Sequence, residues 1–246
     1  MSPGSVATST YAELRGAGEG ALLGLLEESL AVRVSGFLDE ATCAALTAGV
    51  YAGRAVWNRD FGGEQFSLGR AFYVHLEEGR ARDYFAGAPA SDADVARFVP
   101  GLRERMYEAV SLLGPRSRPR PGWCGPGVHV FPAGEKVSRE GGVKHFDLEG
   151  LTDAHVDAGR PAVTFVAMLQ PPATGGGLRV WDVLGGDEAT AERRARGSAV
   201  VAYQAGDLVL IDSYRLHQIQ PFGGKRDRVS ATLHAALVAD RWETWF

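Results

Sequence analysis

Two copies of the pattern His-x-Asp lie close together in the segment VKHFDLEGLTDAHVD, residues 143–157. The first copy pairs His145 with Asp147, and the second pairs His155 with Asp157. Residues two apart on a β-strand face the same way, so either pair can present an imidazole and a carboxylate to one cation. These residue types therefore predict metal binding, with one of the two pairs as its centre.

The neighbours of the two pairs favour the first one. His145 and Asp147 lie among Val143, Phe146 and Leu148, whose side chains suit a strand that packs against a core. The second pair lies in LTDAHVDAGRP, which is polar, contains glycine and begins like a turn or a short capped helix. Only Ala-Gly-Arg then separates it from the apolar run PAVTFVAML, which leaves little chain for a ligand to turn away from the sheet. We therefore predict a metal site at the first pair and a surface loop at the second.

A third ligand is expected from another strand, and His217 meets that requirement. It lies toward the end of GDLVLIDSYRLHQIQPFGG, which is predicted to be a strand that begins at Gly206-Asp207, and it precedes the run RVSATLHAALV. The latter alternates, with polar side chains on one face and Val, Ala and Leu on the other. Its polar face consists of Arg228, Ser230, Thr232 and His234. Such a face either meets water on an edge strand or lines a ligand cavity inside a barrel, and the sequence leaves both open.

Together these motifs resemble those of the Fe(II)/2-oxoglutarate-dependent oxygenases, over about residues 127–237. The resemblance rests on HFD at 145–147, GGGLRVWD at 175–182, AGDLVLID at 205–212, His217, and RVS at 228–230. In that family two histidines and one carboxylate hold iron and leave positions open for 2-oxoglutarate and O2. The resemblance thus implies Fe(II) as cofactor, held by His145, Asp147 and His217, and 2-oxoglutarate and O2 as cosubstrates. It also implies that Arg228 forms a two-point pair with the far carboxylate of 2-oxoglutarate, while Ser230 adds a hydroxyl.

The same resemblance implies a fold and an activity. The fold is a double-stranded β-helix, a cupin-like jelly-roll, in a mainly β chain with flanking helices. The activity is hydroxylation of a C–H bond in a small molecule. The segments HFDLEGL and LQPPATGGGLRVWD look most like branches that hydroxylate or halogenate free amino acids and similar metabolites. Halogenating relatives carry Gly or Ala at the carboxylate position, so Asp147 favours hydroxylation, while desaturation and cyclisation stay open.

One residue departs from the family pattern. Many relatives of the prolyl-hydroxylase type have a tyrosine before the Pro/Gly turn that precedes the metal strand. This chain has Phe131 at that place, in HVFPAG. The departure leaves one hydrogen bond to the cosubstrate unassigned.

Candidate substrate-binding residues come from two regions. An amino-acid carboxylate needs a cation, and Arg70 in SLGRAFYVH is the candidate because a free charge is hard to explain in a mixed apolar and aromatic run. A surface pair with Glu77 or Glu78 is the alternative. Thr232 and His234 lie past Ser230 on the polar face and are further candidates. The terminal segment DRWETWF either closes over the site with its tryptophans or only docks the chain end.

The elements that position these residues divide the chain into two parts. The first part, residues 1–126, is expected to be mainly helical. Its pattern predicts a helix over about 19–30, a short strand around Val32 and a helix that begins at Asp39. The segment SDADVARFVPGLRERMYEAVSLLG predicts a second helical region that is capped by Ser91 and interrupted at Pro100.

The second part changes to a period of two. Short strand-like runs follow one another, separated by Gly, Pro and Asp turns: VHVF, VKHFD, AVTFVAMLQ, LRVWD, AVVAYQ, DLVLID and RVSATLHAALV. Because no helix long enough for parallel crossovers lies between them, we expect an antiparallel sandwich or barrel. The chain is read as one oxygenase domain over 1–246, with a β core at 127–237 and a tail at 238–246.

Composition restricts the partners. The chain has 246 residues, is 45% hydrophobic and carries a formal net charge of -4, as expected for a globular protein. The charge gives no reason to expect a nucleic acid or an anionic membrane as partner, so a small-molecule substrate is expected. Two cysteines and no apolar segment of spanning length suggest a cytoplasmic protein without disulfides. The oligomeric state is left open.

Several other interpretations compete with these. GAGEGA at 16–21 matches a loose dinucleotide fingerprint, but it follows a helix-like run where a strand is needed. The basic loop PRSRPRPGW is expected to be a solvated loop and not a phosphate site. The chain as a whole is alternatively a non-catalytic jelly-roll that binds a small molecule, or a peptidyl hydroxylase. The loops 115–127 and 148–160 suggest lids over a small ligand, which favours the small-molecule oxygenase.

Overall fold

The structure, a computed structural model, describes residues 5–18, 20–185 and 197–246 and consists mainly of β-strands. The strands are β1 Val6–Thr10, β2 Ala31–Ser35, β3 Asn58–Asp60, β4 Gln65–Leu68, β5 Ser117–Pro119, β6 Gly127–Phe131, β7 Ala162–Gln170, β8 Thr174–Gly175, β9 Leu178–Leu184, β10 Ser198–Val201, β11 Leu208–Asp212, β12 Arg215–Ile219, β13 Phe222–Gly223, β14 Arg228–Val238 and β15 Arg241–Trp245. Ten of them form one mixed sheet in the order β1-β2-β11-β7-β14-β6-β4-β3, in which β15 also pairs with β14, and β5 pairs with β15.

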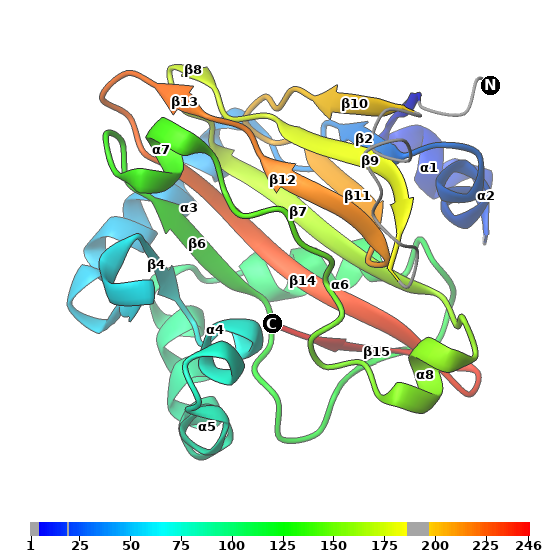
Figure 1. The fold of residues 1–246 in the computed structure, drawn as a ribbon, viewed down its shortest axis with the longest axis horizontal. Coiled ribbons are helices and arrows are strands. Elements are labelled where there is room, and N and C mark those ends of the chain that lie inside the picture. Colours follow the sequence, from blue (N-terminus) through cyan, green and yellow to red (C-terminus); the bar gives the residue numbers. More distant parts are fainter. Residues whose placement is uncertain (1–4, 19, 186–196) are drawn as a thin grey trace.

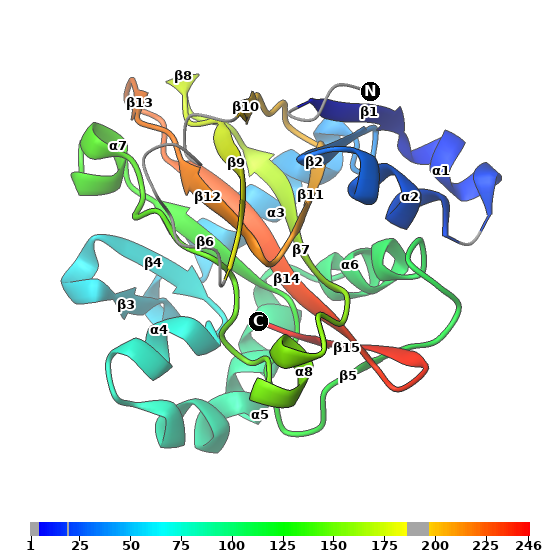
Figure 2. The same cartoon turned by 45° about the vertical axis from the view of Figure 1, so that its right-hand side comes forward.

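A second, smaller sheet lies over the first. It has the order β10-β9-β12, and β8 pairs with β13 beside it. Figures 1 and 2 show β9 and β12 in front of β7 and β14, so the two sheets form two layers. Pairing is antiparallel except between β1 and β2 and between β5 and β15. The predicted antiparallel β core is therefore present. Of the strands in the two parallel pairs, the sequence pattern predicted β2 but not β1, β5 or β15.

Helices cover the outer side of the large sheet and its ends. They are α1 Tyr11–Ala17, α2 Ala21–Glu28, α3 Glu40–Ala52, α4 Phe72–Glu77, α5 Ala81–Phe98, α6 Leu102–Val110, α7 Lys136–Glu140 and α8 Asp153–Asp157, with 3-10 turns at Arg54–Val56 and Phe61–Gly63. Helix α3 packs against β7, on the face away from the small sheet. No helix in the described ranges combines the length and the apolar character needed to cross a bilayer.

The alternation of side chains on β7 and β14 explains how the core and the cavity are separated. The main hydrophobic core takes one face of each strand: Val163, Phe165, Ala167 and Leu169 of β7 with Val229, Ala231, Leu233 and Ala235 of β14. The opposite faces point toward the small sheet. Since β7 is covered on both sides, its sequence AVTFVAMLQ is almost continuously apolar. The polar face of β14 is therefore inside the molecule and not on an edge, because β14 lies between β7 and β6.

Several predictions for the N-terminal part need correction. A strand near Val32 and a helix capped by Asp39 are confirmed, since Asp39 accepts from the Thr42 amide. The helix predicted over about 19–30 is present as α2, and α1 precedes it in the helix-like run before GAGEGA. Ser91 is not a cap: α5 begins ten residues earlier and contains Pro89, and the Ser91 hydroxyl instead accepts a hydrogen bond from the Arg70 amide. The predicted break at Pro100 separates α5 from α6.

The strand predictions also differ at the site itself. VKHFD is not a strand but an extended segment with a single bridge to β12 at His145. The run through His217 is two strands, β11 and β12, which belong to different sheets. The N-terminal part was expected to be mainly helical, yet β2 and β4 pair with β11 and β6 of the core. The tail 238–246 forms most of β15, which pairs with β14.

Candidate metal centre and its cavity

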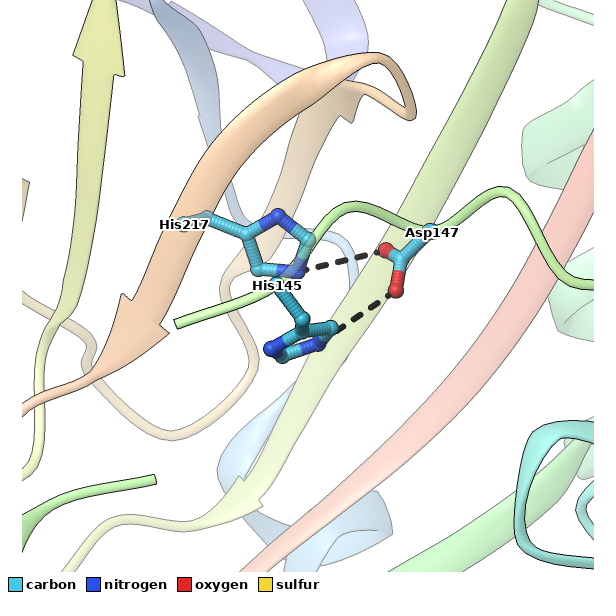
Figure 3. A group of neighbouring side chains, drawn as sticks. All are labelled: His145, Asp147 and His217. Carbon is cyan, nitrogen blue, oxygen red and sulfur yellow. Dashed lines mark ion pairs between the residues drawn. The ribbon is translucent and has the colours of Figure 1, made fainter. Parts of the chain in front are cut away.

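Three side chains from two neighbouring segments converge at one end of the space between the sheets. His217 lies on β12, while His145 and Asp147 lie on the extended segment beside it (Figure 3). His145 and His217 exchange backbone hydrogen bonds of 3.1 and 3.0 Å, and the Asp147 amide donates to the carbonyl of Ser213 at 3.0 Å. Backbone bonds at both ligand positions therefore fix this segment, although it is not a regular strand.

The ligand atoms face one another. Asp147 Oδ1 lies 3.5 Å from His145 Nε2, and Asp147 Oδ2 lies 3.3 Å from His217 Nε2. One such atom from each residue lies within 4.8 Å of the others. Each histidine uses its Nδ1–H to donate to a backbone carbonyl two residues earlier, that of Val143 or Arg215, at 2.9 Å. This bond selects the tautomer that leaves Nε2 free to bind a cation.

The electrostatics of the cluster suit a cation. The Asp147 side chain is 11% exposed, and burial alone raises its pKa, but His217 and His145 outweigh burial and hold the pKa well below its usual range. Burial lowers the pKa of His145, yet Asp147 outweighs it and raises that pKa to about 9. Thr164 Oγ1 donates to Asp147 Oδ2 at 2.7 Å. Two imidazoles and one anchored carboxylate are a donor set that Fe(II) accepts.

A cavity of about 420 Å³ opens beside these three residues, which lies within the range of small-molecule sites. The large sheet lines the cavity with the polar face of β14. All four residues predicted on that face are in the lining: Arg228, Ser230, Thr232 and His234. Apolar side chains of the small sheet and its neighbours line the wall around Arg228: Phe131, Val137, Leu178 and Ile219. The cavity thus has a metal-binding cluster and a buried cation in one space.

Arg228 is buried without a counter-charge. The residue is 2% exposed. Its guanidinium donates to Ser230 Oγ at 3.0 Å and more weakly to the carbonyl of Gly176 at 3.4 Å. No carboxylate of residues 5–18, 20–185 or 197–246 forms an ion pair with it. Burial lowers its pKa. A buried cation is costly unless an anion pairs with it, and the described residues supply no such anion, so a bound ligand with a negative charge would stabilise Arg228.

The two remaining residues of β14 lie near the metal cluster. His234 Nδ1 is 3.1 Å from Thr164 Oγ1, and its ring stacks on Trp245 with centroids 5.8 Å apart. Burial lowers the pKa of His234, so that the neutral form is favoured. Thr232 is 7% exposed and faces the cavity between His234 and Ser230. Both residues are thus placed where a small molecule bound beside the metal would meet them.

Arg70 does not lie in the cavity. Its guanidinium donates to the main-chain carbonyl of Asp83 at 2.9 Å and packs against Gly87 of α5. The alternative pairing with Glu78 is also not formed, because Glu78 pairs with Arg80. The apolar and aromatic run around Arg70 reflects its packing against α5 and not a binding site.

The second His-x-Asp pair is away from the metal cluster. It forms α8, whose cap is Thr152, as the sequence suggested. The loops 115–127 and 148–160 do not form the predicted lids, because the first does not line the cavity and the second lines it only through Glu149. Arg118 and Arg120 of the first loop pair with Glu243 of β15. The carbonyl of Gly150 in the second loop accepts from Arg120 at 2.6 Å. Both loops therefore hold β15, and the basic loop has protein partners in place of phosphate.

The tryptophans of the tail have separate roles. Trp242 belongs to the main core, which corrects the idea that it closes over the site. Trp245 packs behind His234, and its indole N–H donates to the carbonyl of Glu149 at 3.2 Å.

The dinucleotide motif GAGEGA, residues 16–21, begins at the end of α1, and its residue 19 lies outside the described residues. A dinucleotide site is not supported, because the element before the motif is a helix and not a strand.

Sequence reasoning missed several residues of the site. Thr164 lies on the cavity face of β7 and was missed because the residues around it in AVTFVAMLQ are apolar. His129, 5% exposed, lies on β6 opposite Ser230, and burial lowers its pKa to about 3. Tyr203 lies in the loop after β10, with its ring centroid 5.3 Å from the Arg228 guanidinium carbon. The alternation of VHVF and AVTFVAMLQ could have identified the first two, whereas nothing in the sequence placed Tyr203.

Comparison with known proteins gives a fold. Neither a family model nor a curated protein sequence matches the chain. A solved structure does match: the crystal structure of SnoN, described as a non-heme alpha ketoglutarate dependent epimerase from nogalamycin biosynthesis. The likeness covers 95% of this chain and 96% of that one, with a TM-score of 0.56 and 15% sequence identity. At this identity the match shows that the two chains share a fold over nearly their whole length.

Proposed function

We propose that the chain is an Fe(II)- and 2-oxoglutarate-dependent dioxygenase that hydroxylates a C–H bond of a small molecule. The observation that carries the proposal is one cavity with two complementary features. At one place it presents His145, Asp147 and His217 as a cation site, and at another the buried, unbalanced guanidinium of Arg228. A keto acid with a second carboxylate bridges such features, because one end chelates a metal and the other meets the guanidinium.

Each residue then has a defined task. His145, Asp147 and His217 hold the metal, and Thr164 orients the carboxylate of Asp147. Arg228 and Ser230 bind the far carboxylate of 2-oxoglutarate. When bound, iron with 2-oxoglutarate and O2 supplies the oxidant for C–H hydroxylation, and 2-oxoglutarate leaves as succinate and CO2. We interpret the two facing sheets as a double-stranded β-helix, in accord with the alpha-ketoglutarate-dependent neighbour that shares the fold.

The substrate class that we propose is a free amino acid or a similar metabolite. Since Arg70 lies elsewhere, the cation for a substrate carboxylate is Lys136, which lines the cavity and pairs with Glu64 at its exposed rim. The carboxylates of Glu77 and Glu149 line the same cavity and suit a substrate amino group. A zwitterion therefore finds charges of both signs, and neither a nucleic acid nor a membrane is needed as partner.

The reaction type depends on Asp147. A carboxylate at this position occupies a metal position and adds negative charge against a second anion, which opposes chloride binding and favours hydroxylation over halogenation. Desaturation, cyclisation and the epimerisation named for the structural neighbour begin from the same metal site. The mass of the product separates them: hydroxylation adds one oxygen from 18O2, whereas the other three outcomes do not.

The duplicated motif offers a matched test. His145→Ala or Asp147→Ala is expected to lose bound iron and all 2-oxoglutarate turnover, because a metal ligand is removed. The double variant His155→Ala with Asp157→Ala removes the same residue types from α8 and is expected to keep both. Iron is measured by elemental analysis and turnover by succinate release with a panel of amino acids. If only the double variant of His155 and Asp157 lost iron, the metal site would be at α8.

The same assay distinguishes the alternative functions. If the unmodified protein with Fe(II), 2-oxoglutarate and O2 releases no succinate with any substrate, the chain is a non-catalytic binding protein. Turnover with peptides and not with free metabolites would make it a peptidyl hydroxylase. A chlorinated product would contradict the role of Asp147. A product heavier by one oxygen is the expected result.

A further inference from the structure

Tyr203 has a buried hydroxyl beside Arg228 and no hydrogen-bond partner among the described residues. Its ring and that of Phe131 flank the guanidinium, with centroids 5.3 and 5.2 Å from the guanidinium carbon. Tyr203 also packs against the hydrophobic cluster that contains Leu178 and Ile211, two residues that line the cavity. The phenol is therefore buried beside the guanidinium of Arg228 and packs against two residues of the cavity wall.

The hydrogen-bond donors around Arg228 outnumber the acceptors that face them. A guanidinium has five N–H donors and no acceptor, and Arg228 uses only two of its nitrogens, toward Ser230 and Gly176. Ser230 accepts from Arg228, so its own hydroxyl hydrogen is still available. Tyr203 can accept from the guanidinium, but its O–H also needs an acceptor. Arg228, Ser230 and Tyr203 thus each have an N–H or O–H donor for which the described residues supply no acceptor. A carboxylate with two oxygens can accept from all three.

We propose that Tyr203 donates to the far carboxylate of the cosubstrate and, with Arg228 and Ser230, makes this chain select a dicarboxylic keto acid. This inference rests on the proposed function. It also explains the departure at Phe131: the chain lacks a hydroxyl on β6 at that place, and Tyr203 brings one to the same guanidinium from the loop after β10. The hydrogen bond that the sequence left unassigned is then made from a different element.

The test compares two ligands on protein loaded with zinc, which holds the site without turnover. 2-Oxoglutarate and pyruvate share the keto-acid end, but only 2-oxoglutarate has the far carboxylate. Tyr203→Phe is expected to weaken 2-oxoglutarate binding about 10- to 100-fold, which is the loss of one hydrogen bond to a charged group. Pyruvate binding should change by less than about twofold, because its dissociation constant does not depend on the far end. Both constants are measured by isothermal titration.

The matched control is Tyr11→Phe. Among the described residues Tyr11 also has a buried hydroxyl without a partner and lies near a guanidinium, but this guanidinium is that of Arg105, and Tyr11 belongs to α1 and the main core, not to the surroundings of Arg228. It should leave both dissociation constants unchanged. Melting temperatures without keto acid should be equal for Tyr203→Phe and the unmodified protein, since the ring that packs on Arg228 is kept. A lower melting temperature with both ligands weakened equally would mean a structural role and overturn the inference.

A second variant moves the hydroxyl from one ring to the other. In Tyr203→Phe with Phe131→Tyr, the phenol comes from β6 and still lies beside the Arg228 guanidinium, so the preference for 2-oxoglutarate over pyruvate should recover at least in part. An unchanged preference in Tyr203→Phe alone would overturn the inference while leaving the proposed function intact. If the unmodified protein binds neither keto acid more tightly with zinc than without it, the proposed function fails instead.

Discussion

The hydroxyl of Thr164 joins the metal cluster to β14. It lies within hydrogen-bond distance of Asp147, Ser213 and His234. Because Thr164 has one hydrogen, and the ionised carboxylate of Asp147 can only accept, that hydrogen goes to Asp147. His234 and Ser213 must then donate to the Thr164 oxygen. This assigns the Nδ1–H tautomer to His234 and leaves its Nε2 as an acceptor toward the cavity.

This arrangement predicts the effect of removing the hydroxyl. Thr164→Val keeps the shape of the side chain but frees the Asp147 carboxylate, and we expect metal affinity to fall about 10- to 100-fold. Thr164→Ser keeps the hydroxyl and should stay within a few-fold of the unmodified protein. Dissociation constants are measured by competition with a chelator. Equal weakening in both variants would show that packing of the methyl group, and not the hydrogen bond, supports the site.

At the scale of elements, the β3–β4 hairpin carries a buried acid behind the cavity wall. Asp60 is fully buried, and neither of its oxygens has a hydrogen-bond partner in the described part of the chain. Burial raises the pKa of Asp60 to about 7, from the ordinary value of 3.8 for this side chain. The folded state therefore prefers the protonated acid. Between these two values the unfolded chain binds fewer protons than the folded one, so the free energy of unfolding falls as the pH rises and is constant above about 7.

Asp60→Asn removes this dependence. Between pH 5.5 and pH 8 the unmodified protein should lose roughly 2 kcal/mol relative to the variant, and the variant should be the more stable of the two at pH 8. Urea unfolding of both proteins at the two pH values gives the difference in their free energies of unfolding. The contributions of the other titrating groups are the same in both proteins and cancel in this difference. Parallel pH profiles for the two proteins would mean that Asp60 is ionised or solvated in the folded state.

The elements also show which parts of the site could be predicted from the sequence. Alternation on β14 sufficed to place four residues on one face, because a period of two is a local property. It could not tell that this face lines a cavity, since that depends on β9 and β12 lying opposite. His145 and Asp147 were predicted on a strand, but their segment is held by a few bonds to β12 and to Ser213, which no local pattern encodes.

At the scale of the whole molecule, the two parts of the chain form one sheet and one core. Strands β2 and β4 extend the sheet on either side of β11 and β6, and the main cluster contains Val32 and Met106 as well as Phe165 and Leu233. These pairings were not predictable, because β1 to β5 are at most five residues long. Propensity indicated β2 and helices near α2, α3, α5 and α6, but only long-range contacts decide that these short segments pair with the core.

The shared sheet predicts that the β core does not fold alone. A fragment of residues 127–246 keeps the predicted metal ligands but exposes the edges of β11 and β6 and half of the core, and we expect it to aggregate or to lack a cooperative unfolding transition. Circular dichroism during heating and size-exclusion chromatography check this. A monomeric fragment with a sharp transition would instead make the N-terminal part a separate module.

The unbalanced charge of Arg228 has a consequence for the lifetime of the protein. A buried cation without a partner destabilises the resting fold, so Arg228→Met should raise the melting temperature without ligand, by an amount equivalent to about 1–4 kcal/mol, while abolishing the increase that 2-oxoglutarate causes in the unmodified protein. A lower melting temperature for this variant would show that the charge is already compensated. If the expected result holds, supply of the keto acid sets not only the rate of the reaction but also how much folded protein survives proteolysis, so that abundance follows the metabolite.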